Sequence, residues 1–161
     1  MARTARIGRY NFPLDLYYSD QHVWVKIEVG GLVTMGFDDA LAKGTHKIRA
    51  IELVCEEGEL LRGGELAIVE SSKSVEEYTS PITGLITAVN QRLSQIGPSL
   101  VVSHAYDEGW LVRVRPSDLQ SELSELMYGE SAIPFLQDVI ATQSLEDADR
   151  QAAETVTIDE A

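Results

Sequence analysis

Two apolar runs flank a polar turn in the stretch Glu65-Leu-Ala-Ile-Val-Glu-Ser-Ser-Lys-Ser-Val-Glu-Glu-Tyr-Thr-Ser-Pro-Ile-Thr-Gly84. Residues 66–69 and 75–79 have the length and the residue types of β-strands, and polar residues 71–74 separate them. The strands are therefore predicted to pair as a hairpin with Lys73 at its tip. Three acidic residues flank that turn: Glu70, Glu76 and Glu77. Taken alone, a lysine in this position is an ordinary solvated charge.

Short apolar runs separated by turn residues continue on both sides of this hairpin, from Tyr17 to Arg115. Including the hairpin, they predict seven strands, at residues 23–29, 32–37, 48–54, 66–69, 75–79, 85–89 and 111–114. Residues 38–43 are predicted to form a helical turn between two of them. Seven short strands at this spacing favour an antiparallel sandwich or a flattened β-barrel.

The pattern becomes helical after Pro116. One predicted helix would have four apolar residues on one face: Leu119, Leu123, Leu126 and Met127. A second helix is predicted to begin near Pro134, because proline suits the first helical turn. The fold class is therefore mainly β with C-terminal helices. We expect three regions: a basic N-terminal arm at 1–13, a folded domain at 14–141 and a disordered acidic tail at 142–161.

Composition narrows the possible functions. The chain has 161 residues and a formal charge of −13, from 13 basic and 26 acidic residues. This charge argues against nucleic acid and anionic membranes as partners. Because the sequence has one cysteine, no apolar run of membrane length and no signal-peptide pattern, we expect a cytoplasmic protein without internal disulfides. The three histidines lack ligand spacing, so no metal site is predicted.

The hairpin resembles the lipoyl-lysine hairpin of biotinyl and lipoyl carrier domains, most specifically that of the glycine cleavage H-protein family. In that family the turn reads Glu-Ser-Val-Lys-Ala, followed by Ser-Pro and a Gly turn. Here the same elements are Glu70-Ser71-Ser72-Lys73-Ser74, Ser80-Pro81 and Gly84. Other motifs occur in the order that the family has, two before the hairpin, at His22 with Trp24-Val25 and at 32–36, and one after it, at 108–111. The resemblance implies a flattened barrel-sandwich hybrid fold.

The resemblance also implies a function. Lys73 would carry covalent lipoate, and Glu70, Ser71, Ser72 and Ser74 would form the hairpin that presents it. The protein would then be a non-catalytic carrier, modified by a lipoate ligase or lipoyl transferase, whose swinging arm moves a substrate between partner enzymes. A biotin carrier is disfavoured because methionines do not flank Lys73. An unmodified binding module on the same fold is the remaining alternative.

Some positions depart from the H-protein pattern. Where the family usually reads Ser-His-Glu-Trp, this chain has Val23 at the glutamate position. Where the family usually reads Thr-Asp-His-Ala, this chain has Asp38-Asp39-Ala40-Leu41. We expect Val23, Asp38 and Asp39 to line the cleft that holds the arm. A carboxylate that bonds an ammonium contributes about 1.5–3 kcal/mol to its binding. Replacing the family's glutamate by valine therefore disfavours an aminomethyl cargo.

This pattern is more similar to the lipoate-binding proteins of the heterodisulfide-reductase-like sulfur-oxidation system. That similarity implies a sulfur cargo, with the heterodisulfide-reductase-like complex and a lipoamide dehydrogenase as partners. The alternative prediction is a glycine cleavage H-protein that carries the aminomethyl group between the glycine cleavage enzymes.

Overall fold

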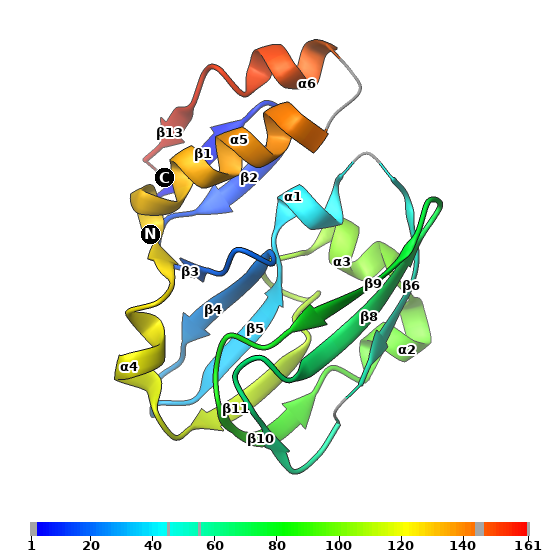
Figure 1. The fold of residues 1–161 in the computed structure, drawn as a ribbon, viewed down its shortest axis with the longest axis vertical. Coiled ribbons are helices and arrows are strands. Elements are labelled where there is room, and N and C mark those ends of the chain that lie inside the picture. The colour runs from blue at the N-terminus through cyan, green and yellow to red at the C-terminus, as the bar shows by residue number, and fades with distance from the viewer. Residues whose placement is uncertain (1–2, 45, 55, 144–146, 161) are drawn as a thin grey trace.

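Three antiparallel sheets form the framework of the molecule (Figure 1). The computed structural model describes residues 3–44, 46–54, 56–143 and 147–160. The largest sheet has the strand order β12-β3-β4-β5-β11-β10-β7, and two three-stranded sheets have the orders β6-β8-β9 and β13-β1-β2. The strands are β1 (Thr4–Ile7), β2 (Tyr10–Pro13), β3 (Tyr17–Tyr18), β4 (Val23–Ile27), β5 (Val33–Phe37), β6 (Ile48–Leu53), β7 (Glu59–Leu60), β8 (Glu65–Ser71), β9 (Val75–Thr79), β10 (Gly84–Val89), β11 (Val112–Pro116), β12 (Met127–Tyr128) and β13 (Thr157–Asp159).

The main core lies between the seven-stranded sheet and the β6-β8-β9 sheet. Alternate side chains of the central strands are apolar and turn inward, as Val33, Met35 and Phe37 do on β5 and Leu66 does on β8. This two-layer arrangement confirms the sandwich form of the predicted mainly-β fold with C-terminal helices.

All seven predicted strands are present, with ends shifted by a few residues. The predicted helical turn is also confirmed, as α1 (Asp39–Ala42), with Asp38 as its N-cap. The second predicted helix is α5 (Ile133–Gln143), which begins one residue before Pro134. The first is shorter than predicted: α4 (Leu119–Leu123) ends before Met127, because Met127 and Tyr128 pair with β3 as strand β12. The remaining helices are short: α2 (Arg92–Ile96), α3 (Ser99–Ser103) and α6 (Asp147–Ala152), with a 3-10 turn at Gly129–Ala132.

The predicted N-terminal arm is wrong for the described residues 3–13. They form the β1-β2 hairpin, which turns at Gly8 with a positive φ of 59°. Alternate side chains are fully buried: Ala5, Ile7, Tyr10 and Phe12. Arg6, which separates Ala5 from Ile7 in the sequence, is exposed on the other side of β1, as the period of two requires.

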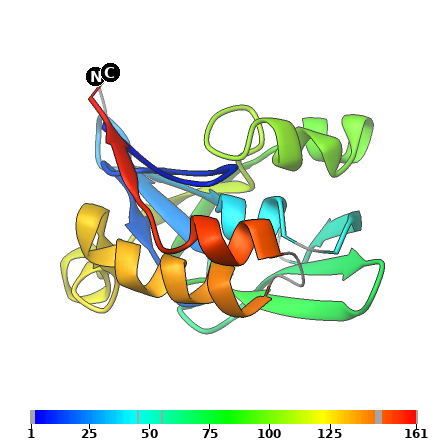
Figure 2. The ribbon, with the colours of Figure 1, turned by 90° about the horizontal axis from the view of Figure 1, so that it is seen from above.

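The predicted disordered tail is also wrong where the structure describes it. Residues 147–152 form α6, and residues 157–159 form β13, which pairs with β1 in the register Ala5↔Ile158. Charge complementarity supports this pairing, because Arg6 Nη1 lies 3.1 Å from the Asp159 carboxylate. Figure 2 shows the two chain ends side by side, on the opposite side of the molecule from the β8-β9 hairpin. None of the described helices is long and apolar enough to span a membrane.

Candidate functional site

The turn between β8 and β9 is held by Ser71. Its backbone N–H donates to the Ser74 carbonyl at 2.8 Å, and its Oγ accepts from the N–H groups of Lys73 and Ser74, each at 3.2 Å. The Ser72 N–H donates to the Lys47 carbonyl at 2.9 Å, which attaches the turn to the residue before β6. These bonds fix the backbone of the turn, so the hairpin sets the direction in which the Lys73 side chain leaves the backbone.

Lys73 is exposed at the tip of this turn, as predicted, and within the described parts of the chain its amine makes no ion pair. Ser72 beside it is also exposed, and Ser71 and Ser74 are half-buried. The acidic residues Glu70, Glu76 and Glu77 are exposed along the two strands. A reagent or an enzyme can therefore reach the amine without opening the fold, and it meets a negatively charged hairpin around it.

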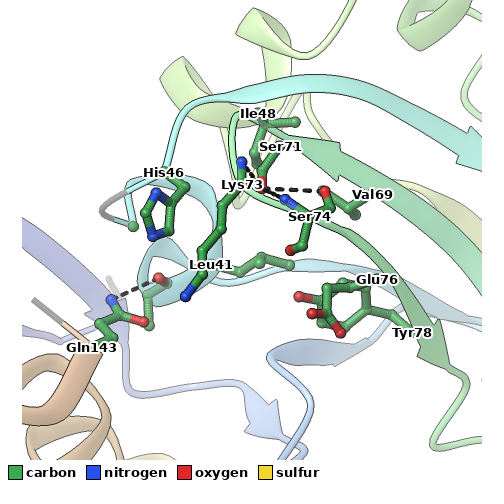
Figure 3. Close-up of a pocket in the computed structure, with 12 residues that line it drawn as sticks. Leu41, His46, Ile48, Val69, Ser71, Lys73, Ser74, Glu76, Tyr78 and Gln143 are labelled. Carbon is green, nitrogen blue, oxygen red and sulfur yellow. Dashed lines mark hydrogen bonds between the residues drawn. The ribbon is translucent and has the colours of Figure 1, made fainter.

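A pocket of about 290 Å³ lies next to Lys73 (Figure 3). The lysine side chain lies along it and forms part of its lining. The other lining residues come from α1 and the loop after it, from the β6, β8 and β9 strands and turn, and from the end of α5: Ala40, Leu41, Gly44, His46, Ile48, Val69, Ser71, Ser74, Glu76, Tyr78 and Gln143. Among the described residues, the pocket is therefore lined by three stretches of the chain, at 40–48, at 69–78 and at Gln143.

The lining of this pocket suits a flexible, largely apolar chain attached at Lys73. Leu41, Ile48 and Val69 supply apolar surface, and each buried methylene of such a chain contributes about 0.8 kcal/mol. Polar groups lie at the rim, where Glu76 is exposed. Burial raises the pKa of the Tyr78 phenol, with smaller contributions from Glu76 and Asp38, so this lining group is neutral and can donate a hydrogen bond. These residues fit a lipoyl group.

The three predicted cleft residues lie elsewhere. Val23 is fully buried on β4 in the main core, and Asp38 is fully buried at the N-cap of α1, where it accepts from the Leu41 N–H at 3.2 Å. Asp39 accepts from the Asn11 N–H at 2.8 Å and lies 3.3 Å from the Lys43 amine. None of the three lines the pocket beside Lys73. The prediction failed because it assigned the start of α1 to the cleft, whereas the following residues, Ala40 and Leu41, face it.

Asp38 instead forms a buried pair with His22. The His22 Nδ1 lies 3.1 Å from Asp38 Oδ2, and the imidazole stacks on Phe135 of α5. Burial by itself would lower the pKa of His22, but the charge and the hydrogen bond of Asp38, with a smaller effect of Asp20, raise it overall. His22 also has a φ of 66°, the only positive φ of a non-glycine residue in the described chain. The pair thus joins the residue before β4 to the N-cap of α1, and the imidazole contacts α5 through Phe135.

Sequence reasoning missed most of the pocket lining. Val69 and Tyr78 were within predicted strands, and their alternation could have placed them on one face of the hairpin. His46 and Gln143 gave no local signal, because their position beside Lys73 depends on how the loop after α1 and the helix α5 pack in the folded chain.

Comparison with known proteins now identifies the family. The model of the family described as "Glycine cleavage H-protein" matches residues 16–139. The H protein of Teredinibacter turnerae is 34% identical over 124 residues, which cover 77% of this chain and 94% of that protein. The probable H protein of Thermococcus gammatolerans is 32% identical over 133 residues, covering 83% and 98%.

A solved structure gives the same answer for the fold. The crystal structure of a glycine cleavage system H protein from Mycobacterium marinum matches with a TM-score of 0.59 and 26% identity, over 66% of this chain and 87% of that one. Glycine cleavage H-proteins are non-catalytic carriers with lipoate covalently attached to a lysine. The family match, the two relatives and the shared fold lead to one conclusion: this chain belongs to the glycine cleavage H-protein family.

Proposed function

We propose that Lys73 is the residue that carries lipoate in this chain, and that the protein is a lipoyl carrier of the glycine cleavage type. The observation that carries the proposal is the exposed amine of Lys73 on a rigid two-stranded hairpin beside a fitting pocket. The motif around Lys73 and the names of the relatives point in the same direction.

The residues of the chain would act by holding the attachment point of the lipoyl arm in place. Ser71 fixes the turn, so that a lipoate ligase or lipoyl transferase meets the Lys73 amine at a constant position. Amide formation by the ligase joins Nζ to the carboxyl carbon of activated lipoate, with departure of the activating group and loss of two protons from the ammonium, and it removes the positive charge of the side chain. When bound, lipoate supplies a disulfide that is reduced to two thiols, whose thiolate form is nucleophilic. Tethering then keeps the cargo at high effective concentration near successive partner sites.

The site assignment is tested by producing the chain with lipoate and a lipoate ligase. The intact mass should increase by one lipoyl group, and the increase should be absent in the Lys73→Arg variant. Lys47→Arg is the matched control, because Lys47 is an exposed lysine whose carbonyl contacts the same turn. Lipoylation of the Lys73→Arg protein would refute the site. A wild-type chain that takes up no lipoate would favour the unmodified binding module.

For the cargo, we propose the aminomethyl group of glycine cleavage, since the relatives that cover most of the chain have that name. The partners would then be the glycine decarboxylase and the aminomethyltransferase. One observation favours a second candidate, the sulfur cargo. Glu76 is the only carboxylate among the described pocket residues, and it is exposed, so the pocket has no buried partner for an ammonium.

One assay separates the two cargoes. The lipoylated chain is added to glycine decarboxylase and aminomethyltransferase, and glycine-dependent CO2 exchange is measured, with the Lys73→Arg chain as the blank. Exchange well above the blank supports glycine cleavage. Absence of exchange, in a chain that a lipoamide dehydrogenase still reduces, would refute that cargo and support transfer of sulfur to a heterodisulfide-reductase-like complex.

A further inference from the structure

Chain segments at and beyond the ends of the family match form a second core. Residues 3–15 and 147–160 are joined by the β1-β13 pairing, and both pack with α5. This core contains buried apolar residues from both ends of the chain, together with Trp24 and Ala40 from the interior of the family match; the former include Ile7, Tyr10, Phe12, Leu136, Ile140 and Ala153. The Gln137 amide of α5 also donates to the Ala153 carbonyl at 2.8 Å. The end of α5 is thereby anchored between the termini and the main domain.

This anchored helix reaches the pocket of Lys73 through its last residue. Gln143 lies four residues beyond the family match and lines the pocket, at the side opposite the β8-β9 strands (Figure 3). Its Nε2 donates to the Ala40 carbonyl of α1 at 3.0 Å. This hydrogen bond joins the wall contributed by α5 to the wall contributed by α1, and Ala40 also packs in the same core as Leu136 and Ile140 of α5.

The surrounding backbone makes room for this contact. The Gly44 N–H donates to the Leu41 carbonyl at 3.3 Å, while the Ala40 carbonyl accepts from Gln143. A Cβ at position 44 would lie 2.9 Å from that same Ala40 oxygen and 3.7 Å from Gln143 Nε2. The glycine thus leaves space in which the carboxamide can meet the helix.

We propose that Gln143 is a positioning residue that keeps the modified Lys73 side chain sheltered in the pocket. The inference rests on the proposed function, since an unmodified Lys73 has no lipoyl arm to shelter. By joining α5 to α1, Gln143 closes the pocket at the end away from the hairpin.

The test measures how fast the sheltered thiols react with a small reagent. The full chain is lipoylated, reduced and treated with iodoacetamide, and alkylation is followed by mass; each thiol forms one S–C bond and releases iodide and a proton. The Gln143→Ala chain should be alkylated about fivefold faster than wild type, the factor that corresponds to one neutral hydrogen bond. Gln143→Glu keeps the volume but cannot donate when ionised, so it should also react faster.

Thr142→Ala is the matched control. Thr142 is the exposed neighbour of Gln143, and its hydroxyl bonds to carbonyls of its own helix. Its variant should be alkylated at the wild-type rate. Both Gln143 variants should be fully lipoylated and should have unchanged urea midpoints. If they are nevertheless alkylated at the wild-type rate, the positioning role is overturned while the carrier function is left intact. A chain that acquires no lipoyl mass would instead overturn the proposed function.

Discussion

Replacing Asp38 with Asn should change the pH dependence of stability, because it removes the charge that faces His22. The substitution keeps an oxygen for the Leu41 N–H and keeps the side-chain volume. The groups that act on the imidazole are Asp38 at 3.1 Å, Asp20 through its charge and Phe135 through stacking. The His22 side chain is 16% exposed and that of Asp38 is 0% exposed, so solvent screens their interaction only weakly.

The sign follows from the pKa of His22, which is raised above 6.5 in the folded protein. The pair therefore stabilises the wild type fully below the unfolded pKa of about 6.5, and this contribution is lost as the pH rises through the folded pKa. A charged hydrogen bond of this kind contributes about 1.5–3 kcal/mol. In the Asn variant burial dominates and lowers the pKa of His22, so protonation should destabilise that variant at low pH.

Urea unfolding of both chains between about pH 5 and 9 measures this difference. Wild type should be more stable by about 1.5–3 kcal/mol at the acidic end, and the difference should shrink toward high pH. Asp107→Asn is the control, because Asp107 faces His104 at 3.5 Å with both side chains largely exposed, and such pairs contribute little. A difference between wild type and Asp38→Asn that stays constant with pH would refute the coupling.

Three further substitutions test packing and the turn. Gly36→Ala would place a Cβ 2.5 Å from the ring of Trp24, whose Nε1 is held by two carbonyls, so urea unfolding should show a loss of about 1–3 kcal/mol. Ile140→Ala removes a fully buried side chain of α5, and the same assay should show a loss of about 2–5 kcal/mol. Ser71→Ala removes the acceptor for Lys73 and Ser74, and the initial rate of lipoylation should fall while Ser94→Ala, at an exposed serine on α2, leaves it unchanged.

The strands of the main domain could be predicted because their signal is local. Residues 75–79 coincide with β9, and the Gly, Pro and acidic turns bound the other runs within a few residues. The β1-β2 hairpin has a local signal, the alternation of apolar and polar residues over 5–12, but the arginines among them favour a basic arm. The β13 strand was missed because it pairs with β1 about 150 residues away. Arg6 and Asp159 were read as charges of loose ends, although each balances the other across that pairing.

The candidate site also has one part that is determined locally and another that depends on the whole fold. Lys73 could be placed from the sequence because a hairpin of adjacent strands decides its exposure, and the bonds that shape its turn come from Ser71, two residues away. The pocket could not be predicted from the sequence, because its walls meet only when two separate cores bring α1, β6 and α5 together. Val23 shows the difference: its type was read correctly as a departure from the family pattern, yet its side chain belongs to the main core. The position of the proposed attachment site is thus a local property of the chain, whereas the pocket that would shelter the arm is a tertiary one. Variants of Gln143 should therefore change the shelter of the arm without changing the site of lipoylation.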